Sequence, residues 1–268
     1  MKITIGELSK IFGLTGEALR YYEKNGILSP QRDSTNRYRY YSSQDVQKIG
    51  TIKKLRNADY SLQDIKQLFE GITDAEYSDL SGQRMAELER ETEFKLAVLQ
   101  RMRHCHNIFI HREQLLRKCK VVQSKSFYRY DFKDIDKLIQ NKESLQRASS
   151  WFRYMPLVNA SSRVPLSTLK RQSDRFSKGL IISKKLAEQF ELDVSEPVEE
   201  IESCRCIYVI LYLEDMRFEQ DLWDQCLLPF IEENQLQPAD HAFTRSITSY
   251  KDINRKYKLY SELFIPLV

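Results

Sequence analysis

The chain has 268 residues, which exceeds the usual size of a single domain and favours two folded domains. Its content of 41% hydrophobic and 30% charged residues excludes a disordered chain. No apolar run approaches the roughly 20 residues of a membrane span, and the N-terminus has no signal-peptide pattern, so we expect a cytoplasmic protein. Residues 1–60 hold 11 lysines and arginines against 6 aspartates and glutamates, while the remainder holds 31 against 32. This asymmetry indicates that the N-terminal segment meets a polyanion.

The start of the chain predicts two short helices joined by a turn, which is the pattern of a helix-turn-helix. Thr4 and Glu7 form a capping box before the first helix, and Gly13 suits the left-handed conformation that ends it. Thr15 can cap the second helix, which stops at Gly26. Two tyrosines and an arginine on the exposed side of this helix suit a nucleic-acid surface better than a core. They are Arg20, Tyr21 and Tyr22.

A ribbon of alternating aromatic and cationic residues follows at 36–41, with the sequence NRYRYY. This alternation predicts a short exposed wing with rings on one side and guanidinium groups on the other. Ser42 and Ser61 then begin two more capped helices, each with apolar residues on one face. The expected order over residues 1–75 is therefore helix, turn, helix, wing, helix and helix.

These motifs resemble the MerR family of transcriptional regulators. The segments that match are 5–8, 19–23, 26–28 and 38–41. The sequence departs from the family at Arg37, where a glycine is often found in the wing turn, and at 57–59, where a glycine commonly precedes the cap of the next helix. The resemblance implies that residues 1–75 form a winged helix-turn-helix that binds double-stranded promoter DNA and acts there on RNA polymerase.

Phosphate contacts position such a module and base contacts give it specificity. The resemblance and the charge pattern together place Thr15, Arg20 and Tyr21 near the major groove. We expect a second group of residues to contact the DNA backbone, and we also assign Thr4 to the DNA-binding residues. This second group is Tyr22, Arg37, Tyr38, Arg39 and Lys53. Alternatively, Tyr22 or Tyr41 packs between the helix and the wing.

A single long helix is predicted over 80–120, because this stretch lacks proline and Gly82 is its only glycine. Two apolar seams with polar interruptions run along it at heptad-like spacings, which predicts a second copy of the chain as the partner. The first seam is Leu88, Thr92, Lys95, Leu99, Met102, His106 and Phe109, and the second is Phe94, Val98, Arg101, Cys105 and Ile108. The MerR resemblance implies that residues 76–120 form an antiparallel coiled coil in a homodimer.

The five cysteines are too few and too scattered for a disulfide framework. Cys105 and Cys119 are fourteen residues apart, and the three nearby histidines point to different helix faces, so we predict neither a metal site nor a cofactor. Cys204 and Cys206 share one face of a strand, an arrangement that ordinary packing explains as well as redox sensing does.

Residues 121–268 show the mixed pattern of an α+β domain. Strands are predicted at 126–132, 155–160, 179–183, 206–213, 241–247 and 256–266, and helices at 135–152 and 218–231. The order strand, helix, strand, strand occurs twice, which suggests an internal duplication.

Strand alternation places Tyr260, Glu262 and Phe264 on one face of the last strand. An unpaired buried carboxylate is costly, and a cationic ligand held between aromatic rings would remove that cost. Alternatively, this face is exposed, or Glu262 pairs with an arginine such as Arg205 or Arg255.

The ending at 261–266 resembles the close of GyrI-like effector-binding domains, in which a glutamate at this place lies in the ligand pocket. The resemblance implies that residues 121–268 bind a small effector, lipophilic or cationic. Further candidates for an aromatic pocket are Tyr154, Phe176, Tyr208 and Tyr212.

We therefore expect a homodimeric, effector-responsive transcriptional regulator, not an enzyme, that acts by distorting promoter DNA. One alternative is a GyrI-like hydrolase that uses Glu262 as acid or base. The other is a regulator that responds to metal or redox state.

Overall fold

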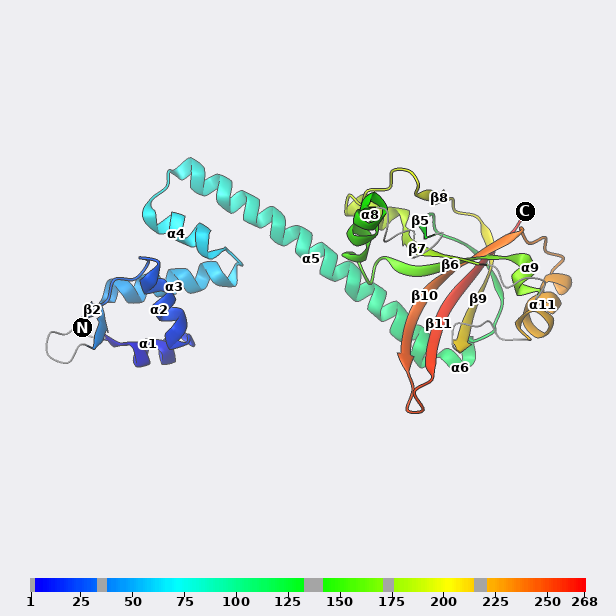
Figure 1. Cartoon of the computed structure of the whole chain (residues 1–268), viewed down its shortest axis with the longest axis horizontal. Coiled ribbons are helices and arrows are strands. Elements are labelled where there is room, and N and C mark those ends of the chain that lie inside the picture. Colours follow the sequence, from blue (N-terminus) through cyan, green and yellow to red (C-terminus); the bar gives the residue numbers. More distant parts are fainter. Residues whose placement is uncertain (1–2, 33–37, 133–141, 171–175, 215–220) are drawn as a thin grey trace. The chain divides into compact units, whose positions relative to one another are not determined.

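The computed structural model describes residues 3–32, 38–132, 142–170, 176–214 and 221–268. The chain divides into two compact units, Met1–Glu91 (unit 1) and Thr92–Val268 (unit 2), and the division falls inside the long helix α5 (Figure 1). No helix of the described residues is both long enough and apolar enough to cross a membrane.

Unit 1 is a small helical module with a three-stranded sheet in the order β1-β3-β2. Its elements are β1 (Ile3–Thr4), α1 (Ile5–Phe12), α2 (Gly16–Lys24), β2 (Gln31–Arg32), β3 (Arg39–Tyr41), α3 (Ser43–Asn57) and α4 (Leu62–Glu70). The predicted caps are confirmed: Thr4, Ser42 and Ser61 each cap a helix, and Gly13 ends α1 with a φ of 62°. Leu8, Leu19, Ile49, Ile52 and Ile65 are fully buried and form the centre of the core.

Helix α5 (Asp74–Ile110) is 37 residues long and ends ten residues before the predicted position. The short helix α6 (Arg112–Leu115) follows, and the chain then enters strand β4 (Lys120–Gln123). Arg117 has a φ of 60° and donates its backbone N–H to the carbonyl of Ile210. The helix therefore gives way to sheet pairing, although neither glycine nor proline marks its end.

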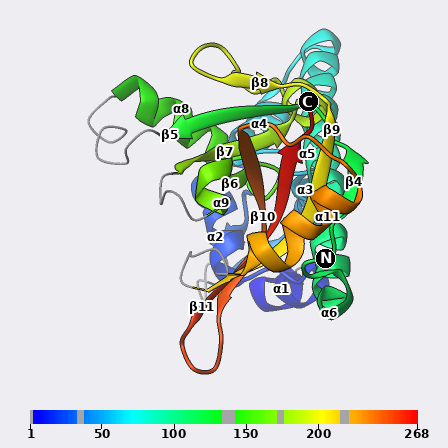
Figure 2. The same cartoon turned by 90° about the vertical axis from the view of Figure 1, so that its right-hand side faces the viewer.

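Unit 2 is built on an eight-stranded antiparallel sheet in the order β4-β9-β11-β10-β6-β7-β5-β8 (Figure 2). Its first half contains β5 (Phe127–Phe132), α8 (Lys142–Phe152), β6 (Asn159–Pro165), α9 (Leu166–Leu169), β7 (Ser177–Ser183), α10 (Lys184–Gln189) and β8 (Glu199–Ile201). Its second half contains β9 (Arg205–Glu214), the π-helical turn η1 (Trp223–Leu227), α11 (Leu228–Glu233), β10 (His241–Lys251) and β11 (Tyr257–Pro266). In each half the third main strand, β7 or β11, lies between the other two.

Three predicted elements of unit 2 differ in extent from the structure. The strand expected at 155–160 starts only at Asn159, because residues 153–157 form turns, and it continues to Pro165. Residues 218–220 of the helix expected at 218–231 lie outside the described residues, and its remainder includes a π-helical turn followed by α11. The first part of the helix expected at 135–152 lies outside the described residues, and its remainder is α8.

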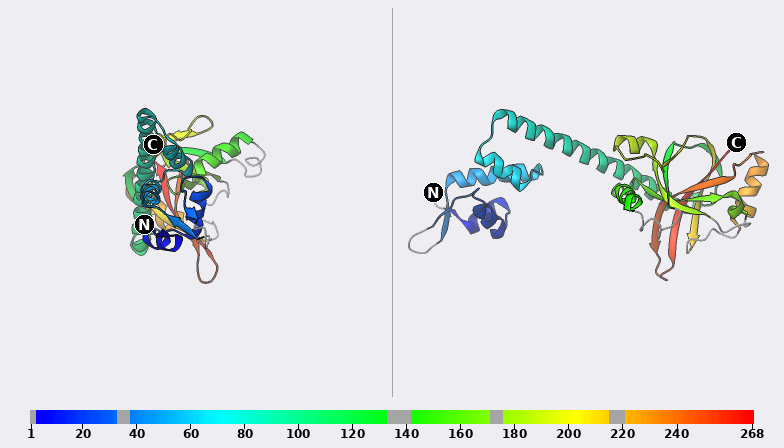
Figure 3. Two further views of the ribbon diagram at one scale, coloured as in Figure 1. Left: turned by 90° about the vertical axis from the view of Figure 1, so that its left-hand side faces the viewer. Right: turned by 45° about the horizontal axis from the view of Figure 1, so that its top comes forward.

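The two faces of the sheet are covered differently. Helices η1 and α11 pack on Ile207, Val209 and Leu211, and helices α8 and α10 pack on the same face of the other half. Figure 3 shows α11, in orange, and α8, in green, at opposite ends of the sheet. The part of α5 within unit 2 lies on the other face, where Cys105, Ile108 and Phe109 contact Ile210 and Tyr260.

The second predicted seam of α5 therefore has an intramolecular partner. Phe94 contacts Tyr154 and Phe190, and Arg101 donates to Asn159 and Ser246. Within the first seam, Leu88, Leu99 and Met102 remain exposed on the chain. The inference that both seams need a second copy of the chain is wrong for the second seam and for Phe109 of the first, which contacts Tyr260.

Candidate DNA-recognition surface and candidate ligand site

Helix α2 presents the residues expected at the major groove. The hydroxyl of Thr15 accepts from the backbone N–H of Ala18 at 3.1 Å and fixes the start of the helix. Arg20 is exposed, and its guanidinium lies beside the first turn, where a side chain on Gly16 would begin 3.6 Å away. Tyr21 is 46% exposed. A rigid helix thus offers a donor fork and a phenol to solvent.

Tyr22 is not part of this surface. It is 6% exposed and packs in the core of unit 1 with Tyr41, which is 1% exposed. Tyr22 directly follows Tyr21, so the 100° step of the helix turns its ring inward. Its burial in the core with Tyr41 favours the alternative of packing between the helix and the wing over a contact with the DNA backbone.

The wing strand is tied to α2 through a carboxylate. Arg39 donates to Glu23 at 2.9 Å, and the hydroxyl of Tyr41 donates to the other oxygen of the same side chain. Arg39 is thus already paired, with a third of its side chain exposed. Tyr38 is 65% exposed on the wing, and Arg37 lies outside the described residues.

Two other predicted DNA contacts have structural partners in α1. The ammonium group of Lys53 donates to the carbonyl of Phe12 at the C-terminal end of that helix, where a cation is favourable. The hydroxyl of Thr4 donates to Glu7 at 2.8 Å within the capping box. Both residues hold α1 in place, whatever else they contact.

In unit 2, Glu262 is 1% exposed and fully partnered. Arg245 binds it in a bidentate manner, with Nε at 2.6 Å and Nη2 at 3.0 Å, and the hydroxyl of Tyr208 donates at 3.1 Å. His104 and Arg101 of α5 approach it at 3.2 and 3.7 Å. The premise of an unpaired carboxylate is therefore wrong.

The alternative of an arginine partner is right, but the partners are not Arg205 or Arg255. Arg245 stands directly opposite Glu262 in the pairing of β10 with β11. Burial by itself raises the pKa of Glu262, but the hydrogen bond with His104 and the charges of both arginines outweigh it and hold that pKa well below its usual range. Glu262 is thus a permanent anion at neutral pH.

Arg101 is also mostly buried, but not all of its N–H groups are hydrogen-bonded. Its side chain is 10% exposed, and Nη2 donates to the side-chain oxygen of Asn159 at 2.9 Å and to the carbonyl of Ser246 at 2.6 Å. Its Nε and Nη1 are buried without a hydrogen-bond acceptor among the described residues. Burial, and then the neighbouring charge of Arg245, lower the pKa of Arg101. Two guanidinium groups therefore share one carboxylate.

The predicted pocket aromatics separate into two places. Tyr260 and Phe264 lie on the Glu262 face, where Phe264 stacks on Phe243 at a centroid distance of 5.0 Å. Tyr208 and Tyr212 flank them, with ring centroids 5.2 Å from Phe264 and 5.4 Å from Tyr260, respectively. Tyr154 contacts Phe94 and Phe190 instead, and Phe176 is 37% exposed just before β7.

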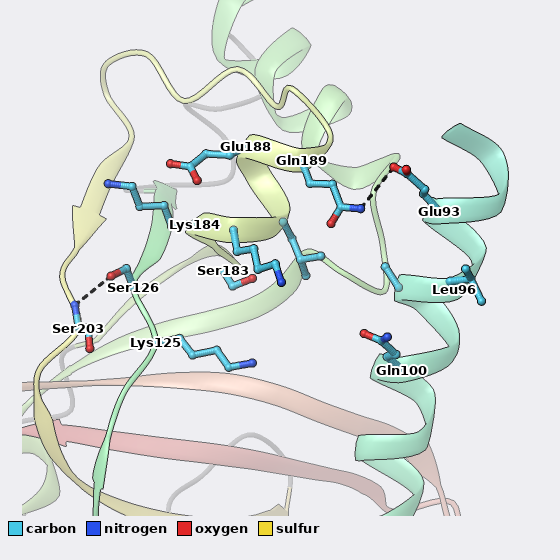
Figure 4. A pocket seen from close by; sticks show the side chains of 13 residues that line it. Glu93, Leu96, Gln100, Lys125, Ser126, Ser183, Lys184, Glu188, Gln189 and Ser203 are labelled. Carbon is cyan, nitrogen blue, oxygen red and sulfur yellow. Dashed lines mark hydrogen bonds between the residues drawn. The ribbon is translucent and has the colours of Figure 1, made fainter. Parts of the chain in front are cut away.

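The sequence did not predict a polar groove of about 790 Å³ between α5 and the junction of β7 with α10. Figure 4 shows Lys125 and Gln100 reaching toward one another from opposite walls, while Lys184 and Glu188 lie on the side of α10 away from α5. Glu93 on α5 accepts from Gln189 on α10. Only the tertiary arrangement brings these segments together, so no local motif marks the groove.

The cysteines form two close pairs. The sulfur of Cys119 is 3.3 Å from that of Cys226, and Cys204 is 3.5 Å from Cys206. Within the described parts of the chain, no three or more histidine, cysteine, aspartate or glutamate side chains gather in a way that could hold a metal ion.

Unit 1 is similar in sequence to known proteins. Residues 3–72 match the family model described as MerR HTH family regulatory protein. The transcriptional regulator HmrR of Sinorhizobium medicae is 32% identical over 117 residues, which are 39% of this chain and 77% of that protein. The chain belongs to the MerR family. CueR of Escherichia coli O157:H7 is a further relative, 29% identical over 114 residues that are 42% of this chain and 78% of CueR.

Among solved MerR-type structures, the EcmrR–DNA complex covers 99% of both chains at 16% identity, with a TM-score of 0.36. A TM-score this low does not establish a common arrangement, so membership of the MerR family rests on the sequence matches. Those to HmrR and CueR span only about two fifths of this chain. Unit 2 is therefore interpreted from its own residues.

Proposed function

We propose that this MerR-family protein is a homodimeric transcriptional regulator that binds promoter DNA through unit 1 and a small effector through unit 2. The observation that carries the proposal is the exposed pair Arg20 and Tyr21 on α2 of a winged helix-turn-helix. An arginine on such a helix suits the acceptors of guanine in the major groove, and wing residues such as Tyr38 suit the phosphates beside it.

A homodimer is supported by the exposed part of the first seam on α5. Leu88, Leu99 and Met102 are 40, 41 and 59% exposed. Exposed apolar residues at heptad-like spacing on a long helix are typical of a coiled-coil interface, here with the polar residues Thr92 and Lys95 between Leu88 and Leu99. Two copies of α2 on one duplex would follow from this pairing, and an antiparallel coil remains the arrangement that the family resemblance implies.

The effector function of unit 2 is supported by the way its sheet holds α5. Arg101 and His104 of this helix contact Glu262 on β11, and the same helix continues into unit 1. A ligand that changes these contacts would change the position of α5. This gives a route from effector binding to the promoter distortion, and the action on RNA polymerase, that we propose for the dimer. The GyrI-like nature of unit 2 remains part of this proposal.

The enzyme alternative is not favoured by the site. A hydrolase would need Glu262 to exchange a proton, but its partners hold its pKa well below its usual range, so it is neither a proton donor nor an effective base near neutral pH. The alternative of a metal- or redox-responsive regulator agrees with the names of some relatives, such as the heavy metal-dependent transcription regulator 2 of Rhizobium meliloti. The hydrogen bond with Cys226, and then burial, raise the pKa of Cys119, and burial raises the pKa of Cys206, which disfavours the thiolate form that binds metal or reacts.

The proposed function is tested by sequencing the DNA fragments that the protein retains in cells. We expect enrichment of promoter fragments that share one sequence with two-fold symmetry. The double variant Arg20→Ala/Tyr21→Ala should lose this enrichment, since it removes the two exposed groups of α2 and leaves the core unchanged. Retention of random fragments by the wild-type protein would contradict promoter recognition.

A further inference from the structure

The buried face of unit 2 carries more positive than negative charge. Arg101 and Arg245 are both packed against Glu262, so one carboxylate faces two guanidinium groups. Arg245 has its full bidentate contact, whereas Arg101 keeps Nε and Nη1 without an acceptor among the described residues. An uncompensated buried cation is costly, and an anion close by reduces that cost.

A second arginine-bearing pair, Arg129 with Asp131, lies on β5 of the same sheet. Arg129 is 1% exposed, and its guanidinium fits there because residue 179 is glycine: a side chain at that position would begin 3.0 Å from Nη1 of Arg129. The carboxylate of Asp131 balances the charge of Arg129. The surplus of positive charge is therefore located at Arg101 and Arg245.

Some residues that line the polar groove are adjacent in sequence to this positive region. Gln100 lines the groove, and the next residue of α5 is Arg101. On the opposite wall Ser126 lines the groove, and the ring of the next residue, Phe127, lies 5.5 Å from the guanidinium carbon of Arg245. Neither arginine is among the described residues that line the groove, so a ligand there would meet other cations.

The groove itself offers cations and donors at its surface. Lys184 is paired with Glu200 at 2.5 Å, but no carboxylate of the described residues lies within 4.0 Å of the amine of Lys125 or Lys185. Hydroxyl groups of Ser126 and Ser183 and the amide of Gln100 add neutral donors. Two carboxylates also line the groove: Glu93 on α5 accepts from Gln189, and Glu188 lies beside Lys184 on the side of α10 away from α5.

We propose that this groove is a binding site for a small organic anion, with Lys125 and Lys185 as its counter-charges. The volume of about 790 Å³ suits a drug-sized molecule. Ammonium groups bind carboxylate, sulfonate or phosphate groups through charge-assisted hydrogen bonds. This inference rests on the effector function proposed for unit 2, and gives the ligand the charge opposite to that expected from Glu262 alone.

The test uses two dyes that share the xanthene ring system and differ in charge: fluorescein, an anion, and a rhodamine ester, a cation. Fluorescence polarisation with the full chain measures the affinity of each at fixed salt. We expect fluorescein to bind at least tenfold more tightly than the rhodamine ester. The double variant Lys125→Ala/Lys185→Ala should weaken fluorescein binding by about tenfold or more, because it removes two charged donors.

The matched control is Lys118→Ala/Lys178→Ala, which removes two exposed lysines outside the groove and should leave the affinity unchanged. Equal weakening in both double variants would show a general effect of charge and overturn the site. Tighter binding of the rhodamine ester would overturn the anion class while leaving an effector function in place. Failure of both dyes to bind would overturn the site, while the promoter recognition of unit 1 is judged separately by the retained DNA.

Discussion

The charge of Glu262 is held by Arg245 on β10 and by Arg101 and His104 on α5. Burial alone raises the pKa of this carboxyl, but the hydrogen bond with His104 and the arginine charges lower it by more, so it lies well below the ordinary value of 4.5. A group with a depressed folded pKa gives stability that is fully present above its unfolded pKa and is lost as the pH falls toward the folded value. Unit 2 should therefore lose stability in acid.

We predict that the stability of unit 2 in urea falls as the pH is lowered from about 6 to about 3, and that Glu262→Gln removes much of this dependence. At neutral pH the variant should be about 3–5 kcal/mol less stable, because two buried guanidinium groups lose their counter-ion. Tryptophan fluorescence is a suitable signal, since both tryptophans, Trp151 and Trp223, lie in unit 2. Glu200→Gln, which breaks a surface pair with Lys184, should cost less than about 1 kcal/mol. Equal losses in the two variants would refute the account of Glu262.

At the scale of one element, α5 has two functional sides. Phe94, Arg101 and Ile108 contact other parts of unit 2, while Leu99 and Met102 are exposed. We predict that the protein sediments as a dimer at micromolar concentration and that Leu99→Glu/Met102→Glu makes it a monomer, because charges at a coiled-coil seam lose hydration without gaining a partner.

Ile253→Glu is the control for this prediction, since Ile253 is 98% exposed on the hairpin between β10 and β11 and lies outside the seam. This variant should remain a dimer. If the wild-type protein sediments as a monomer, the exposed seam of α5 is not a dimer interface.

The beginnings of helices in unit 1 were predictable, whereas the end of α5 was not. The caps at Thr4, Ser42 and Ser61 depend on residues only three positions apart, so the sequence alone specifies them. After α5 and the short helix α6 the chain pairs with a distant strand, where the carbonyl of Ile210 accepts from Arg117. No residue near position 110 indicates from the sequence that the helix ends there.

At the scale of the whole molecule, unit 1 was the more predictable of the two units, because its motifs are dense and its charge is concentrated. In unit 2 the sequence correctly placed Tyr260, Glu262 and Phe264 on one face but missed Arg245. Counting pairs from the hairpin turn would place Ser246 opposite Glu262. A bulge between Ser246 and Thr248 shifts the register by one residue and brings Arg245 there instead.

The groove of unit 2 also could not be predicted from the local sequence. Lys125, Lys185 and Gln100 come from a loop, a short helix and α5, which meet only after the sheet has formed. None of them stands in a spaced motif. A prediction of the ligand class therefore needs the tertiary charge balance and not the strand pattern alone.

The most direct measurement of the central claim is a gel-shift titration of a retained promoter fragment at fixed salt with Arg20→Ala. The account predicts that this variant stays dimeric and binds the fragment about 1–3 kcal/mol more weakly, because it loses one base contact. Arg90→Ala, which removes the same charge from an exposed position on α5, should bind like the wild-type protein. If Arg20→Ala holds the fragment as tightly as the wild-type protein, Arg20 does not read DNA and α2 is not the recognition helix.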